Sequence, residues 1–219
     1  MPIRPPAPTA STANAQDDSG KLFAPSAARN AAALCTARRT IAPQRGTVLE
    51  IASGTGQHVV TFAASMPHLL WHPSEVEQTR LTSIAVHIRE SGLKNINVPI
   101  MLDATKIGWG RNIEPKELIT LANLLHLISE PEVETLLSEA SEALCANGVL
   151  SLYGPFKRDG KLTSDGDVTF DASLRAHDPD TGYKDDSWIK ETARSVGLRY
   201  AQTIEMPANN LLMVFDKAL

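Results

Sequence analysis

The chain has 219 residues, of which 42% are hydrophobic and 21% are charged, and its formal net charge is −4. These values are typical of one globular domain with a sizeable core. A sequence pI near 5.9, without a dense Lys/Arg stripe, argues against a nucleic-acid partner. No apolar run approaches the roughly 18 residues that a membrane-spanning helix needs, and the N-terminus does not read as a secretion signal. We therefore expect a cytoplasmic protein with no membrane partner.

The first 20 residues differ in composition from the rest of the chain. Pro2, Pro5, Pro6 and Pro8 stand among Ala, Ser, Thr and Asp, a composition that buries too little apolar surface to offset chain entropy. We expect a disordered tail over residues 1–20 and a single domain over 21–219. The alternative is a lid that orders when substrate binds.

No spacing in the sequence suggests a metal site. Cys35 and Cys145 lie far apart without a CxxC or Cys/His pattern, so we interpret both as core residues. The scattered histidines also fail to form a ligand set: His58, His68, His72, His87 and His177.

Helical and strand patterns alternate along the chain. Pro25 and Ser26 open an Ala-rich helical pattern that runs to residue 39 and that Pro43 stops. Beyond it, the pattern predicts helices at 57–65, 76–91, 131–145 and 186–196, and strands at 47–51, 69–71, 96–101, 118–122, 149–153, 198–205 and 210–215.

This alternation predicts an α/β fold with a seven-stranded, mostly parallel sheet and helices on both faces. Only residues 206–209 separate the last two strands, too few for a crossover helix, so these strands must form an antiparallel hairpin. A parallel sheet that ends in one such hairpin is typical of the class I methyltransferase, Rossmann-like fold. It is a less natural ending for a nicotinamide-binding domain.

The most informative stretch is residues 48–58, VLEIASGTGQH, in which an apolar strand runs directly into a Gly-x-Gly turn. Gly54 and Gly56 can bring backbone close to a ligand at the carboxyl end of a strand. A dinucleotide fingerprint would place a third glycine where Val59 stands. Together with Glu50 inside the strand, this favours a ligand with a cationic amino-acid moiety, S-adenosylmethionine, over a pyrophosphate. A tight turn without any ligand is the alternative.

Two further acids follow predicted strands. Glu75 lies about 20 residues beyond Gly54, where a carboxylate can accept both ribose hydroxyls. Asp103 follows the third strand and can accept from an adenine amino group. Each of them alone is more often solvated surface, but their joint spacing favours a cofactor site.

Several stretches together resemble one family. They are Ser26-x-x-Arg29-Asn30, residues 48–58, Trp71-His72-Pro73-Ser74, Leu102-Asp103, Asn123 with His126, Leu152-Tyr153-Gly154-Pro155-Phe156-Lys157, Phe170-Asp171-x-Ser173-Leu174-Arg175, and Glu205-Met206-Pro207-Ala208-Asn209-Asn210-Leu211. They are similar to the methyltransferase-like family, first catalogued as a domain of unknown function, whose eukaryotic member is methyltransferase-like protein 26.

The resemblance covers residue 23 to the C-terminus and implies a class I S-adenosylmethionine-dependent methyltransferase fold, without implying a substrate. The sequence departs from the family at Glu75 and Glu117, where the family usually has aspartate. The predicted cofactor residues are Arg29, Asn30, Glu50, Ala52, Ser53, Gly54, Gly56, Gln57, His58, Glu75, Asp103, Ala104 and Asn123.

Catalytic residues are harder to predict, because in-line methyl transfer can rely on alignment and exclusion of water. Asn123 and His126 follow the fourth strand, and a histidine there can remove a proton near neutral pH; Tyr153 is the third candidate. For His126 the alternative is a hydrogen-bonding residue beneath the pocket. The predicted substrate residues are Tyr153, Lys157, Arg158, Asp171, Arg175, Asn209 and Asn210. For Arg158 the alternative is solvated surface, for Asp171 and Arg175 it is an ordinary helical ion pair, and for the two asparagines it is a turn.

The sequence thus predicts a methyltransferase that acts on a small-molecule O, N or S nucleophile. One alternative keeps the cofactor but uses it for another reaction, such as a cyclisation; another is a non-catalytic binding protein on the same fold. An NAD-linked oxidoreductase is more distant, because Val59 and the terminal hairpin disfavour it. The sequence is compatible with a homodimer.

Overall fold

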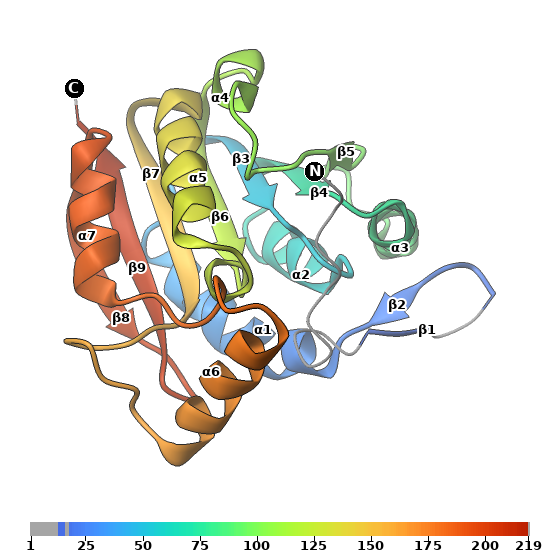
Figure 1. Ribbon diagram of the computed structural model, residues 1–219. Coiled ribbons are helices and arrows are strands. Elements are labelled where there is room, and N and C mark those ends of the chain that lie inside the picture. The colour runs from blue at the N-terminus through green and yellow to red at the C-terminus, as the bar shows by residue number, and fades with distance from the viewer. Residues whose placement is uncertain (1–12, 16–17, 219) are drawn as a thin grey trace.

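A seven-stranded sheet forms the centre of the protein (Figure 1). The structure is a computed structural model, and it describes residues 13–15 and 18–218. The sheet order is β5-β4-β3-β6-β7-β9-β8, in which only the pairs with β9 are antiparallel. The predicted class I methyltransferase fold with its terminal hairpin is therefore confirmed. The strands are β3 (Gly46–Ile51), β4 (Leu69–Glu75), β5 (Ile100–Met101), β6 (Lys116–Ala122), β7 (Leu144–Pro155), β8 (Leu198–Glu205) and β9 (Asn210–Lys217).

Helices cover both faces of the sheet, and each layer closes one hydrophobic core cluster. On one face lie α1 (Pro25–Arg39), α2 (Gln57–Ser65) and α3 (Gln78–Ser91); on the other lie α4 (Trp109–Asn112), α5 (Glu130–Ala143) and α7 (Asp186–Ser195). Within the described residues, no helix combines the length and apolar character needed to cross a membrane.

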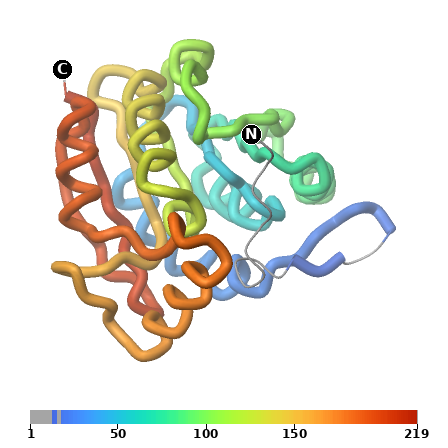
Figure 2. The backbone as a smooth tube through the Cα atoms, in the orientation of Figure 1, coloured from blue at the N-terminus to red at the C-terminus, as the bar shows by residue number. Residues whose placement is uncertain are grey.

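One helix lies outside these two layers. The orange segment that contains α6 (Asp165–His177) loops out beyond the carboxyl edge of the sheet before the chain returns to α7 (Figure 2). Its first turn is capped by Ser164, whose side chain accepts a hydrogen bond from the Asp167 N–H. Between β6 and α5, the short 3-10 helix η1 (Leu125–Leu127) approaches the same segment, because the carbonyl of His126 accepts from the Gly182 N–H at 3.0 Å.

The predicted boundaries differ from the structure at several elements. The strands predicted at 69–71 and 149–153 are longer in the structure, as β4 and β7 respectively. The strand predicted at 96–101 is paired as β5 only over its last two residues, while Ile96 forms an isolated bridge with Trp71. Pro99 interrupts the ladder, because proline has no backbone N–H to donate. The helix predicted at 131–145 ends at Ala143, and the chain enters β7 directly. The short elements α4 and η1 were not predicted.

The N-terminal part of the described chain forms a small hairpin of β1 (Asn14–Ala15) and β2 (Leu22–Phe23). The Leu22 N–H donates to Ser83 Oγ of α3 at 2.8 Å, which anchors the hairpin beside the glycine loop. Of the tail predicted over residues 1–20, residues 1–12 and 16–17 lie outside the described residues.

Candidate functional site

The carboxyl ends of β3 and β6 meet at the centre of the sheet, where the chain turns in opposite directions to reach β4 and β7. Ligands of open α/β sheets bind at such a switch point. Ala52 (φ 52°) and Asn123 (φ 58°) follow directly after these strands, and both are non-glycine residues in the left-handed region. This conformation costs about 1–3 kcal/mol and is often found at functional sites. The strand ends therefore mark the candidate site.

Gly54 and Gly56 are glycines for different physical reasons. Both have positive φ, 60° and 95°. A Cβ on Gly56 would lie 2.8 Å from Ile84 Cα, so this glycine lets α3 pack against the loop. A Cβ on Gly54 would meet only Arg80 Nη1, at 3.8 Å. The open space for a ligand therefore lies at Gly54.

The two glycines predict different responses to alanine. We expect Gly56→Ala to lower the free energy of unfolding by about 2 kcal/mol, because left-handed strain of about 1–2 kcal/mol adds to a backbone clash. In a domain of this size, that corresponds to a fall in Tm of about 4–8 °C. Gly54→Ala should lower the free energy of unfolding only by the left-handed strain, because its Cβ would make no close contact. Thermal unfolding of both variants without ligand checks this difference, and equal Tm values would contradict it.

Glu75 is held beside the glycine loop. Its Oε2 accepts from the Gly54 N–H at 2.9 Å and its Oε1 from the Val76 N–H at 2.8 Å. Burial raises the pKa of Glu75, against the opposing effects of the Val76 N–H, Arg80 and the Gly54 N–H. Each carboxylate oxygen has lone pairs left for a further donor. A ligand above Gly54 would therefore meet a fixed acceptor.

The remaining predicted loop residues have structural partners. The Ser53 N–H donates to the Ser74 carbonyl at 2.8 Å, and Gln57 Oε1 accepts from the Ala24 N–H at 2.6 Å. Asp103 Oδ1 accepts from the Thr105 N–H and hydroxyl, which closes a turn beyond β5, and Ala104 is buried. These contacts shape the loops around the strand ends.

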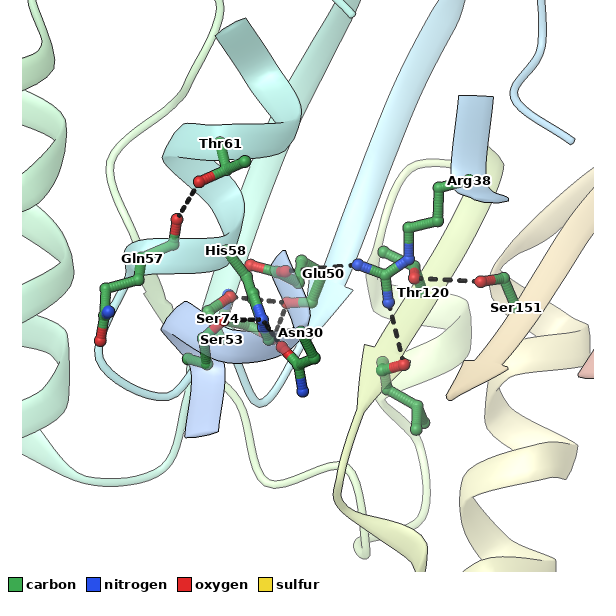
Figure 3. A network of polar contacts seen from close by, with 12 residues as sticks. Asn30, Arg38, Glu50, Ser53, Gln57, His58, Thr61, Ser74, Thr120 and Ser151 are labelled. Carbon is green, nitrogen blue, oxygen red and sulfur yellow. Dashed lines mark hydrogen bonds and ion pairs between the residues drawn. The ribbon is translucent and has the colours of Figure 1, made fainter. Parts of the chain in front are cut away.

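A chain of polar contacts runs beneath the loop from α1 to β7 (Figure 3). His58 Nε2 lies 2.7 Å from Asn30 Oδ1 and 3.2 Å from the Ala27 carbonyl. Both partners are acceptors, so Nε2 carries the proton, and burial, followed by the charge of Arg38, lowers the pKa of His58 to about 4. Tyr153 hydrogen-bonds Asn30 and is 2% exposed. These three predicted residues therefore meet beneath α1, whereas Arg29 is exposed on that helix.

His126 lies in η1, 4% exposed, against the rings of Phe170 and Tyr183 at centroid distances of 5.7 and 6.1 Å. Burial, followed by the charge of Lys184, lowers the pKa of His126 to about 3. The imidazole is therefore neutral throughout the physiological range. The predicted ability to exchange a proton near pH 7 assumed an ordinary pKa, which this buried site does not provide.

Most of the predicted substrate residues form hydrogen bonds or ion pairs with other residues of the chain. Asp171 accepts from the Tyr183 N–H at 2.6 Å and from Arg175 Nε at 3.0 Å, and Arg158 forms an ion pair with Glu205 at 2.8 Å. The amide of Asn209 donates to Asp167, that of Asn210 to the carbonyls of its own turn, and the backbone of Lys157 pairs with Lys184 and Asp186. These contacts fasten α6, residues 178–185 and the turn before β9 beyond the sheet edge.

Asp167 is not among the predicted site residues, although its side chain connects α6 with residues 178–185 and with the turn before β9. It accepts from Ser164, Thr163, Tyr183 and Asn209. The pattern Ser164-x-x-Asp167 at a helix start could have identified it. Glu117, the second departure from the family pattern, lies at the amino end of β6 and accepts from the Thr47 N–H at 2.6 Å, on the edge opposite the site. Within the described residues, no cluster of three His, Cys, Asp or Glu side chains suits a metal ion.

The sheet order and the glycine loop at the switch point define the class I methyltransferase fold. The chain belongs to the family described as "Protein of unknown function (DUF938)", whose model matches residues 21–217.

Solved structures agree with this fold. An O-methyltransferase family protein from Burkholderia thailandensis is 16% identical, with a TM-score of 0.69, over 80% of this chain and 52% of that one. An O-methyltransferase family 2 protein from Planctomyces limnophilus DSM 3776, in complex with apigenin, is 16% identical, with a TM-score of 0.70, over 86% and 62%. CalO1, a methyltransferase of calicheamicin biosynthesis in its SAH-bound form, is 16% identical, with a TM-score of 0.70, over 88% and 54%. The chain thus spans between about half and three fifths of these proteins' length.

Proposed function

We propose that the protein is an S-adenosylmethionine-dependent methyltransferase that acts on a small-molecule nucleophile. The observation that carries the proposal is the Glu75 carboxylate fixed beside the open face of Gly54, at the carboxyl ends of β4 and β3. A ribose offers two hydroxyl donors, and a buried carboxylate is a strong acceptor for them. Within its family, we propose kinship with methyltransferase-like protein 26.

The residues present fit this cofactor. Glu75 and Asp103 would face its adenosine, while Glu50, beneath the loop, would supply negative charge for its amino-acid end. When bound, the cofactor would supply an electrophilic methyl group on a cationic sulfur: the acceptor would form a bond to the methyl carbon in line as the carbon–sulfur bond breaks, and S-adenosylhomocysteine would leave. The chain itself would hold the acceptor in line and exclude water. The segment that contains α6 lies beyond the carboxyl edge of the sheet and is hydrogen-bonded to η1, so these two elements would cover that side of the site. The solved proteins named above as O-methyltransferases favour an oxygen nucleophile.

Isothermal titration of the full chain with S-adenosylmethionine and S-adenosylhomocysteine tests the proposal. We expect both to bind, because neither the ribose nor the amino-acid end differs between them. Absence of binding to both at millimolar ligand would overturn the proposal. Incubation with methyl-labelled cofactor and a panel of hydroxylated small molecules then distinguishes the reaction. Labelled product with an equal amount of S-adenosylhomocysteine supports methyl transfer, whereas product without it would indicate a different reaction.

A further inference from the structure

A buried charged pair lies beneath the glycine loop (Figure 3). Arg38, in the last turn of α1, is 0% exposed, and Glu50, near the end of β3, is 2% exposed. Arg38 Nη1 lies 4.0 Å from Glu50 Oε1, and the guanidinium stands over the Phe62 ring at 4.4 Å. Neither residue can reach bulk water, so each depends on its neighbours for charge compensation.

The pair is incompletely satisfied. Among the described residues, Arg38 Nε, Arg38 Nη1 and Glu50 Oε2 have no hydrogen-bond partner. Removing charges from water costs several kcal/mol for each ion, and an apolar pair of similar volume is often as stable or more stable. Stability alone therefore does not explain why a core cluster that is otherwise mostly apolar contains this pair.

Arg38 also connects the two strands that flank the switch point. Its Nη2 donates to the Leu121 carbonyl of β6 at 3.0 Å, while its Nη1 faces Glu50 of β3. Leu121 and Glu50 each stand two residues before a left-handed residue, Asn123 and Ala52 respectively. One guanidinium thus reaches both strand ends from which the site is built.

We propose that Arg38 is a positioning residue for cofactor binding: it holds Glu50 beneath the loop, where the Glu50 carboxylate can attract the α-ammonium of the cofactor, and it fixes the end of β6. This inference rests on the proposed function, because the ammonium belongs to the cofactor proposed above. Arg38 would act through Glu50 and β6 and would not contact the cofactor itself.

The electrostatics of the pair support this role. Burial raises the pKa of Glu50 to about 7; Arg38 and Ser53 oppose the rise and Glu75 adds to it. Arg38 is the one cation among the groups that shift the pKa of Glu50. The other titratable groups near the pair are Cys35 on α1, Tyr153 on β7 and His58 on α2, and burial lowers the pKa of His58 to about 4, which leaves it neutral. Without Arg38, the Glu50 carboxyl would keep its proton at neutral pH.

The test is the pH dependence of S-adenosylhomocysteine binding to the full chain, measured by isothermal titration from pH 5.5 to 8.5. A carboxyl with a pKa of about 7 increases its ionised fraction about tenfold between pH 6 and pH 8. We therefore expect wild-type affinity to rise about tenfold over that range through this group. Glu50→Gln should lack this rise, and it also reveals any contribution from Glu75.

Two variants of Arg38 separate charge from packing. Arg38→Met keeps much of the volume without the charge, so its affinity should follow that of Glu50→Gln up to pH 8. Arg38→Lys keeps the charge and should keep the rise, with weaker binding because one ammonium cannot replace both guanidinium contacts. A wild-type profile in Arg38→Met, or loss of the rise in Arg38→Lys, would overturn the inference. The lysine variant decides the matter if the methionine variant does not fold.

The wild-type protein separates this inference from the proposed function. If it binds S-adenosylhomocysteine and Glu50→Gln keeps the full pH-dependent rise, the role of Arg38 fails and the proposed function stands. If the wild-type protein binds neither S-adenosylhomocysteine nor S-adenosylmethionine at millimolar ligand, both fail.

Discussion

Replacing Glu75 with alanine is expected to weaken binding of S-adenosylhomocysteine by about 10- to 100-fold, since hydrogen bonds to a charged acceptor contribute about 1.5–3 kcal/mol. Two effects add in this variant. The proposed ribose acceptor is lost, and the N–H groups of Gly54 and Val76 lose their partner. The loop would then be less well positioned for the rest of the ligand.

Isothermal titration of the wild-type protein and of Glu75→Ala measures this loss. Glu191→Ala is a matched control, because it removes the same side chain from an exposed position on α7; its affinity should stay within about threefold of wild type. If Glu75→Ala is folded by circular dichroism and its affinity for S-adenosylhomocysteine changes by less than about threefold, Glu75 is not the ribose acceptor.

The sheet and its surrounding helices could be predicted because local patterns determine them. Strand β3 is a short apolar run that ends at a glycine turn, and only four residues separate β8 from β9, so the hairpin follows from chain length. The boundaries were less predictable. Whether residues 96–99 pair with β4 depends on Pro99 and on the neighbouring strand, neither of which a periodic pattern describes.

The candidate site also contains both residues that the sequence predicts and residues that it does not. Glu50, Gly54 and Glu75 could be found because each stands at a fixed distance from a strand end. Arg38 could not be, because a basic residue in the last turn of a helix normally faces solvent and stabilises the helix dipole. Only the packing of α1 on the sheet shows that this arginine is buried against Glu50.

The predicted substrate residues show a further limit. Asp171 and Arg175 are four residues apart, a spacing that equally suits a pocket wall and an ordinary helical pair. In the structure, Arg175 Nε lies 3.0 Å from Asp171 Oδ2, and the other Asp171 oxygen accepts a hydrogen bond from the Tyr183 N–H. No sequence pattern specifies that residue 183 returns to α6, so the partner of this carboxylate could not be predicted.

The second large effect concerns His126, which we expect to orient the acceptor by a hydrogen bond rather than to remove its proton. Full proton transfer would create an imidazolium at a site where burial and Lys184 lower the pKa to about 3, so the charged form is strongly disfavoured. A neutral imidazole can still donate or accept a hydrogen bond. Because the pKa is lowered to about 3, the neutral form predominates at every pH above that value, and turnover should show no inflection from His126 between pH 5.5 and 8.5.

Two variants distinguish an orienting residue from a base. His126→Gln keeps a hydrogen-bonding group but loses the ring, whereas His126→Phe keeps a ring against Phe170 and Tyr183 but loses the hydrogen bond. If His126 orients the acceptor, His126→Phe should raise the KM for the acceptor about tenfold, since a buried hydrogen bond is worth about 1–1.5 kcal/mol, while His126→Gln stays within about threefold. If His126 is the base, both variants should lose about 10²- to 10⁴-fold in kcat, because neither side chain can take the proton. Steady-state rates at saturating cofactor, measured across that pH range with an acceptor found in the panel, decide between the two. A wild-type inflection near pH 6.5 that disappears in both variants would contradict the orienting role and restore His126 as the base.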